Sequence, residues 1–315
     1  MIITYICPFT GLGNQLFMYA AGLSLATRLN TELVLGSWDD KFSANEQRDY
    51  YLSRTNFPAI TEREANFHDI KQILSTSIAF RAAFKNFIAY KPIRRHHIFR
   101  RLIRKLFHKL VPNSMSGRIY HYKTPILTGN FDNISNNTCI IGFCESEKFF
   151  INVSDLVRKK LKFADSCFNP ELTRKIKSCN SIALHVRRGD KVNSGFLPSN
   201  EYYNRAAIEK IYSLTSNPEF FVFSDDINYC RETLPKIYPD AKYNFIDGQT
   251  PAQDMALMTI CKHVITGPST FSWWGAWLNE NPEKIIIAPD VNLWSRNPSL
   301  KASNYLLPER WIKIS

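Results

Sequence analysis

The sequence has no acidic residue between Asp69 and Asp132, and this gap accounts for the basic charge of the chain. The 315 residues include 40 Lys and Arg against 28 Asp and Glu, a net charge of +12. Thirteen of the basic residues lie in the gap, which leaves 27 basic against 28 acidic residues elsewhere. A protein that binds nucleic acid usually spreads its basic residues over a binding face. The confined charge therefore argues against nucleic acid as a partner.

The sequence also lacks the common patterns of metal-binding and disulfide-bonded proteins. It has no Asp-x-Asp, no His-x-x-x-His and no Cys-x-x-Cys, so we predict neither a carboxylate-bound divalent metal nor a zinc site. The 7 cysteines are an odd number without a pairing pattern, and they favour a reducing, cytoplasmic location. No Gly-x-Ser-x-Gly motif indicates a serine hydrolase.

Charged side chains are absent from residues 1–27, yet we do not expect a signal peptide or a membrane span there. Polar and turn-forming residues between Pro8 and Gln15 interrupt the apolar run, and no Lys or Arg precedes it.

Strands and helices are predicted to alternate in two runs. The first run predicts a strand at Ile2–Cys7, a helix at Asn14–Asn30 and a strand at Glu32–Gly36. The second run predicts strands at Ser181–Val186, Phe220–Ser224, Tyr243–Ile246, His263–Thr266 and Lys284–Ala288. Helices are expected between them, at about Ser199–Ser213, Asn228–Tyr238, Pro251–Cys261 and Ser272–Asn279. This alternation is typical of an α/β fold with parallel, doubly wound sheets.

The length of the chain favours two domains. The stretch Phe163–Pro170 is polar and ends in proline, as linkers often do. We therefore expect an N-terminal domain at residues 1–165 and a C-terminal domain at residues 166–315, with the basic stretch at about 70–131 as an insert in the first.

A cluster of polar groups ends the first strand of the second run, in the segment Leu184–Asp190 (LHVRRGD). Open α/β sheets bind ligands at the carboxyl ends of their strands. Because the planar guanidinium group gives two parallel hydrogen bonds to phosphate and keeps its charge, an arginine here suits a pyrophosphate, and Asp190 could orient it. A surface Arg–Asp pair worth about 0 to 1 kcal/mol remains the alternative.

The segment Gly267–Gly275 (GPSTFSWWG) follows another strand and opens a helix. Its Ser and Thr residues predict a helix cap, and the hydroxyl and backbone N–H groups suit phosphate oxygens. The alternative is a cap alone with aromatic core residues behind it, and packing is the favoured interpretation for Trp273 and Trp274.

Two further segments have a similar position. Thr10–Gln15 (TGLGNQ) has glycines that permit close approach of the backbone, but it lacks the third glycine of the dinucleotide motif and the lysine of the P-loop. Asp225 and Asp226 end a strand, where a carboxylate could accept the two donors of a guanine edge. The alternative role is the cap of the next helix.

Taken together, the segments resemble the bacterial α-1,2-fucosyltransferases of glycosyltransferase family 11. GLGNQLFMYAAG, LHVRRGD, FSDD and STFSWWGAWL occur here in the order and spacing of that family. The resemblance implies a GT-B fold, with two Rossmann-like domains facing each other across a cleft. It implies transfer of L-fucose from GDP-β-L-fucose with inversion and without a metal or other cofactor. The expected product is an α-1,2 linkage at the 2-hydroxyl of a terminal β-galactoside, as in O-antigen or other surface polysaccharide biosynthesis.

The resemblance also implies roles for single residues. Arg187 matches the arginine held against the donor pyrophosphate, Arg188 and Asp190 complete that cluster, and Asn14 matches the residue that faces the transferred sugar. We therefore expect Arg187, Asp190 and Asn14 to be catalytic. By similarity, the His185 backbone and Asp225 contact guanine, and the turn at 269–272 binds phosphate. The full expected donor site is Gly13, Asn14, His185, Arg187, Arg188, Asp225, Ser269, Thr270, Phe271 and Ser272.

The chain departs from the family pattern at a few positions. Thr10 stands where the family commonly has glycine, and Lys191 where it commonly has tyrosine. Cys144 and Glu145 replace a usual Trp-Gln pair, a change that bears on the acceptor more than on the donor.

No general base is identified for the acceptor hydroxyl. Asp39 and Asp40 are candidates by position, and Glu145 is another. Asp190 is a candidate only if it is not committed to an arginine.

The basic stretch contains an amphipathic pattern at Phe99–Leu110, with apolar residues on one helical face and five basic residues opposite. Such a helix suits an anionic membrane surface, where each cation contributes about 1 kcal/mol. We expect residues 91–110 to contact the inner face of the cytoplasmic membrane peripherally, near a galactose-terminated or lipid-linked glycan. A helix packed on the core is the open alternative.

Two other functions remain open. A fucosyltransferase of another linkage would share the arginine segment but less of the GLGNQ segment. A basic membrane- or nucleic-acid-binding protein would explain the charge, but not LHVRRGD or STFSWW.

Overall fold

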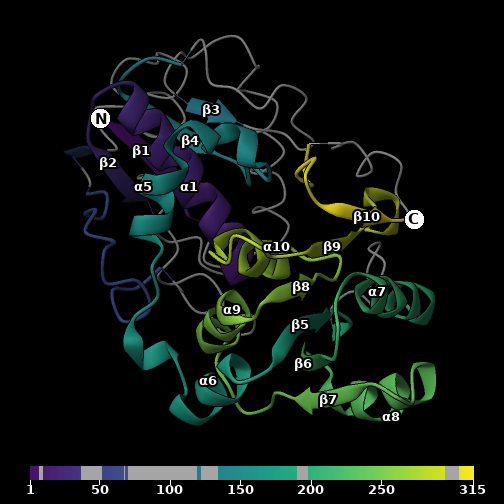
Figure 1. Cartoon of the computed structure of the whole chain (residues 1–315). Coiled ribbons are helices and arrows are strands. Elements are labelled where there is room, and N and C mark those ends of the chain that lie inside the picture. Colours follow the sequence, from purple (N-terminus) through teal and green to yellow (C-terminus); the bar gives the residue numbers. More distant parts are fainter. Residues whose placement is uncertain are drawn as a thin grey trace, which may run out of the picture.

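The computed structural model describes residues 1–6, 10–36, 52–66, 68–69, 119–121, 134–189, 198–294 and 305–315. These residues form two parallel sheets with helices packed against them (Figure 1). The expected α/β class with parallel sheets is confirmed. The predictions for Asp39, Asp40, Asp190, Lys191 and residues 91–110 fall outside the described residues.

The first sheet has the strand order β2-β1-β4-β3. Its strands are β1 (Ile2–Tyr5), β2 (Leu33–Gly36), β3 (Ile119–His121) and β4 (Thr138–Ile141). Helix α1 (Leu12–Arg28) follows β1, so the predicted strand–helix–strand unit is confirmed. The helix begins two residues before the expected start, because Gly11 has an extended backbone and is the N-cap.

The second sheet has the order β10-β9-β8-β5-β6-β7. Its strands are β5 (Asn180–Val186), β6 (Pro218–Ser224), β7 (Lys242–Phe245), β8 (His263–Ile265), β9 (Ile286–Pro289) and β10 (Ile312–Ile314). The helices between them are α7 (Glu201–Leu214), α8 (Ile227–Ile237), α9 (Pro251–Ile260) and α10 (Thr270–Leu278). All predicted strands and helices of this run are confirmed, while β10 was not predicted. The strand order reverses between β5 and β8, and ligands of such sheets bind at that point.

Side chains of the second sheet alternate between two apolar layers, as the pleat of a strand requires. In β5, Ile182, Leu184 and Val186 belong to the cluster that includes residues of α7 and α8. Ala183 belongs to the opposite cluster, with residues of α9 and α10. The sheet is therefore covered on both faces, which explains why its strands are continuous apolar runs.

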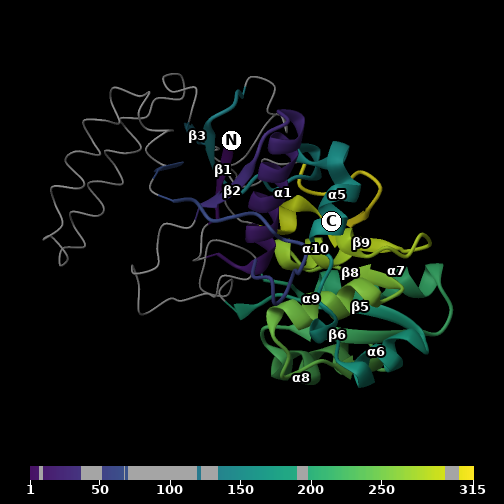
Figure 2. The same cartoon turned by 90° about the vertical axis from the view of Figure 1, so that its left-hand side faces the viewer.

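The apolar layer of α10 is continuous with that of the first sheet. Helix α1 packs on α10, and both views place α10 between α1 and β8 (Figures 1 and 2). The ring of Phe17 lies 4.5 Å from that of Trp273 and 5.0 Å from that of Trp274, between centroids. Both tryptophans are fully buried, which confirms their packing role.

The segment between the two sheets contains α5 (Ser154–Lys160) and α6 (Pro170–Lys177). The predicted linker between these helices is not an exposed connection, because Phe163 and Cys167 are buried in the shared core. The division at residue 165 remains a prediction. Among the described helices, none is both long and apolar enough to cross a membrane.

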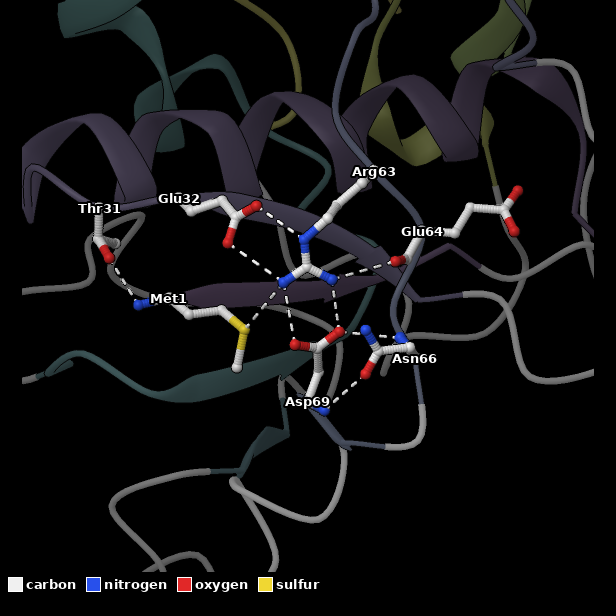
Figure 3. A network of polar contacts seen from close by, with 7 residues as sticks. All are labelled: Met1, Thr31, Glu32, Arg63, Glu64, Asn66 and Asp69. Carbon is white, nitrogen blue, oxygen red and sulfur yellow. Dashed lines mark hydrogen bonds and ion pairs between the residues drawn. The ribbon is translucent and has the colours of Figure 1, made fainter.

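Arg63 connects the described stretch 52–66 to the edge of the first sheet (Figure 3). Its guanidinium donates to Glu32, with Nε 2.8 Å from Oε1, and to Asp69, with Nη2 2.9 Å from Oδ1. The hydrogen bonds from Arg63 hold the pKa of Asp69 below its usual value. Since Glu32 directly precedes β2, this network lies at the amino ends of the strands and stabilises the sheet edge there.

Candidate active site

Strand β5 brings Arg187 to the carboxyl edge of the second sheet, at the point where the strand order reverses. The Arg187 backbone is fixed by Ser199. Its N–H donates to Ser199 Oγ at 2.9 Å, and the Ser199 N–H donates to the Arg187 carbonyl at 2.8 Å. Ser199 is buried, and nothing in its sequence context indicates this contact.

Asp225 holds the arginine segment from the end of β6. Its Oδ2 lies 2.8 Å from Arg187 Nη1, and its Oδ1 accepts from the Arg188 backbone N–H at 2.9 Å. Gly189 permits this arrangement, because a Cβ at that position would lie 2.3 Å from Asp225 Oδ2. The Arg187 and Asp225 side chains are 22% and 25% exposed, so the ion pair is shielded but reachable.

Arg188 has different partners. Its Nε lies 3.3 Å from Asp226 Oδ2, and its guanidinium carbon lies 3.5 Å from the centroid of the Tyr229 ring. Asp226 is also the N-cap of α8, since its Oδ1 accepts from the Tyr229 N–H at 3.2 Å. The cap role predicted as an alternative is confirmed for Asp226, and the sequence analysis missed Tyr229.

His185 and Phe271 bring β5 and α10 together beside the arginine segment. Their ring centroids are 5.5 Å apart, and His185 is buried at 4% exposure. The predicted contact of the His185 backbone with guanine remains a prediction.

The N-terminus of α10 is a tightly bonded turn. Ser269 Oγ accepts from the Phe271 N–H at 3.3 Å, which confirms the predicted cap. Ser272 Oγ donates to the Gly267 carbonyl at 3.3 Å and accepts from the Gly267 N–H at 3.2 Å. Both serine side chains are buried and bonded within the turn, so they shape it.

The first turn of α1 meets the first turn of α10. A Cβ on Gly13 would lie 2.4 Å from the Thr270 carbonyl carbon and 2.5 Å from the Phe271 nitrogen, so only glycine fits there. Next to it, Thr270 Oγ1 donates to Asn14 Oδ1 at 2.6 Å. Two residues predicted separately as donor contacts therefore touch each other across the two sheets.

Asp254, in the first turn of α9, is a residue that the sequence analysis missed. Helix α9 follows β7, so its N-terminus lies at the same carboxyl edge as Arg187 and Asp225. Burial, and secondly the charge of Asp247, raises the pKa of Asp254 to about 7. A carboxyl that is partly protonated near neutral pH can both donate and accept hydrogen bonds. Such shifts are common at functional sites, although no sequence motif marks this one.

The described residues do not reach every predicted group. Asp190 lies outside them, and within the described ranges Asp225 and Asp226 form ion pairs with the two arginines. Glu145 is described and partly exposed, next to the buried Cys144. No group of three or more His, Cys, Asp or Glu that could hold a metal occurs in the described part of the chain.

This arrangement can bind an anion. Arg187 and Arg188 directly follow β5. The N-termini of α1 and α10, which carry partial positive charge, meet beside them. A guanidinium has five N–H donors, so an arginine held by one carboxylate can still bind phosphate oxygens.

Comparisons with known proteins identify relatives of this chain. Two curated relatives come from Escherichia coli. The alpha-1,2-colitosyltransferase is 29% identical, with 96% of each chain covered, and the O-antigen biosynthesis glycosyltransferase WbnK is 27% identical over 98% of this chain and 100% of its own. The galactoside alpha-(1,2)-fucosyltransferase 2 of Mus musculus is 35% identical over 105 residues, which cover 31% of this chain and 30% of its own.

Among solved structures, the fucosyltransferase NodZ from Bradyrhizobium is similar in fold. Its TM-score is 0.50 at 15% identity, with 87% of this chain and 91% of that chain covered. The expected GT-B type of fold is thereby confirmed. The model of glycosyl transferase family 11 matches residues 13–315, and this chain is therefore a member of glycosyltransferase family 11.

Proposed function

We propose that this glycosyltransferase transfers L-fucose from GDP-β-L-fucose to the 2-hydroxyl of a terminal β-galactoside, forming an α-1,2 linkage with inversion and without a metal. The single observation that carries the proposal is the shielded Arg187, fixed by Asp225 and Ser199 beside the N-terminus of α10. The linkage is supported by the names of two relatives, a colitosyltransferase and a fucosyltransferase, which both specify α-1,2.

The proposed role of Arg187 follows from where charge develops. As the bond from fucose C1 to the β-phosphate breaks, the sugar gains oxocarbenium character and negative charge collects on GDP. A cation already in place stabilises that charge without reorganisation, and removal of one comparable donor costs about 2.7 to 4 kcal/mol in other enzymes. The ion pair with Asp225 fixes Arg187 before the donor binds.

Other donor contacts follow from the same placement. The N-terminal turn of α10, Ser269–Ser272, offers backbone N–H groups to the diphosphate. His185, Asp225 and the partly protonated Asp254 are candidates for the guanine edge, which presents both donors and acceptors. Arg188 and Asp190 complete the arginine cluster in this proposal.

We propose a galactose-terminated oligosaccharide or lipid-linked glycan as the acceptor, and the cytoplasm as the location. The O-antigen enzyme among the relatives supports a surface polysaccharide pathway. Peripheral membrane contact through residues 91–110 remains part of the proposal. The general base stays open among Asp39, Asp40, Glu145 and Asp190.

Colitose is the second candidate for the transferred sugar, because the relative with 29% identity is named for it. A fucosyltransferase of another linkage is tested by the same product analysis. Competition of nucleic acid against GDP tests the remaining alternative, a nucleic-acid-binding protein.

The experiment incubates the protein with GDP-fucose or GDP-colitose and a panel of β-galactosides, with and without EDTA, and determines the product linkage by NMR. We expect an α-1,2-fucosylated product that EDTA does not diminish. Arg187→Ala should lower kcat by about 10²- to 10³-fold. The matched control is Arg231→Ala, which removes an exposed arginine of α8 whose Nη2 lies 3.8 Å from Asp247 Oδ2. This variant should leave kcat unchanged. Near-normal transfer by Arg187→Ala, or loss of activity with EDTA, would refute the mechanism.

A further inference from the structure

The contact between Thr270 and Asn14 joins the first turns of α10 and α1 through polar side chains. Thr270 is the first residue of α10, which follows β8, and Asn14 lies in the first turn of α1, which follows β1. Thr270 Oγ1 donates to Asn14 Oδ1 at 2.6 Å. Both residues are partly buried, so the bond is shielded but next to the arginine edge.

The hydrogen-bond capacity of Thr270 limits what else its side chain can do. A hydroxyl has one proton to donate, and here that proton is given to Asn14. Phosphate oxygens only accept hydrogen bonds. The Thr270 hydroxyl therefore cannot donate to a diphosphate while it holds Asn14.

The same bond orients the carboxamide of Asn14. Its oxygen is directed at Thr270, so the nitrogen on the other side of the planar group points away from Thr270. The amide then presents its two N–H donors in a fixed direction. Without the threonine hydroxyl, the group could rotate by half a turn and present its oxygen there instead.

Backbone packing keeps the two residues in register. Gly13 lies so close to Thr270 that a Cβ would be 2.6 Å from the Thr270 carbonyl oxygen. On the α10 side, Ser269 caps the helix and Ser272 bonds to Gly267. The donor hydroxyl and the acceptor amide are thus carried on two fixed turns.

We propose that Thr270 is a positioning residue, whose hydroxyl fixes the Asn14 carboxamide so that its N–H donors face the transferred sugar, which GDP lacks. Thr270 then acts on the transfer step and not on nucleotide binding. This inference rests on the proposed function and deepens it.

The test compares Thr270→Val, which keeps the shape and removes the hydroxyl, with Thr270→Ser, which keeps the hydroxyl. We expect Thr270→Val to lower kcat about tenfold, as expected for one lost hydrogen bond, with the Kd for GDP within about twofold of the wild type. Thr270→Ser should recover most of the activity. Thr259→Val is the matched control, because its hydroxyl donates within its own helix, to the Ala256 carbonyl of α9 at 2.7 Å.

A double-mutant cycle with Asn14→Ala isolates the coupling. If Thr270 acts through Asn14, then Thr270→Val lowers kcat no further in the Asn14→Ala background. Effects that multiply, or a Thr270→Val variant that loses GDP affinity at normal kcat, would overturn the proposal and favour direct phosphate binding.

An NMR measurement separates this inference from the proposed function. The side-chain amide signal of Asn14, assigned in asparagine-labelled protein by its loss in Asn14→Ala, should shift in Thr270→Val and stay in place in Thr270→Ser. An unshifted signal in Thr270→Val would overturn the inference whatever sugar the enzyme transfers. Failure of the wild type to use GDP-fucose would instead count against the proposed function.

Discussion

Asp254 provides a test of the structure that needs no substrate. Burial in the first turn of α9 raises the pKa of this carboxyl from 3.8 to about 7. Between about pH 4 and pH 7, Asp254 in the folded protein holds a proton that the same residue has released in the unfolded chain. The free energy of unfolding therefore falls as the pH rises from about 4 to about 7, and it stays constant with respect to this group above that. At roughly 1.4 kcal/mol for each pKa unit, the full loss is about 4 kcal/mol.

Asp254→Asn removes this dependence, because asparagine has the shape of the neutral carboxyl and cannot ionise. We expect the variant and the wild type to be equally stable near pH 4, and the variant to be more stable by up to about 4 kcal/mol near pH 8. Urea unfolding followed by circular dichroism at several pH values measures both. Asp240→Asn, which makes the same substitution at an exposed turn, is the control. A stability difference between Asp254→Asn and the wild type that is the same at every pH would refute the reasoning.

Two further predictions concern the site itself. Gly13→Ala should destabilise the fold by about 1 to 3 kcal/mol, because the new Cβ would lie 2.4 Å from the Thr270 backbone. Gly275→Ala should cost less than about 1 kcal/mol, because its Cβ would lie 3.0 Å from the adaptable Met258 side chain. Thermal unfolding of both variants measures the two losses, and equal losses would contradict the packing argument. Asp225→Asn keeps an acceptor for the Arg188 N–H but removes the charge that holds Arg187. We therefore expect kcat to fall about tenfold while the thermal unfolding temperature stays unchanged. An unchanged kcat would argue against a role of Asp225 in orienting Arg187.

The strands of the second sheet could be predicted because they are covered on both faces. A strand such as β5 is then an uninterrupted apolar run, and its ends are marked by polar residues. The short strands were missed for the opposite reason. β4 has four residues and follows a polar stretch, and β10 has three residues with Lys313 between two isoleucines. Such fragments form strands only because a neighbouring strand pairs with them.

The residues that gather at the site could largely be predicted, but their partners could not. Arg187 and Asp225 are 38 residues apart, and they meet because β5 and β6 pair in parallel with Val186 beside Ser224. The next residues of both strands then emerge side by side. The sequence indicates that each strand ends in polar groups, but it does not show which strands are neighbours. It therefore offers the local Asp190 for orienting an arginine and does not reveal Asp225 in that role, while Asp190 itself lies outside the described residues.

The expectation of two separate domains rests on chain length, and length does not show how the domains are joined. One buried cluster contains Phe17 of α1, Phe150 between the sheets and Trp273 of α10. Phe150 stacks on Trp274 at 5.3 Å, and the Trp273 indole N–H donates to the Leu306 carbonyl at 2.7 Å, so this cluster is also fixed by directional contacts. The spacing between the first turns of α1 and α10 is therefore set by side-chain packing behind them. A hydrogen bond as short as that between Thr270 and Asn14 can persist across the two sheets because the core beneath it is shared.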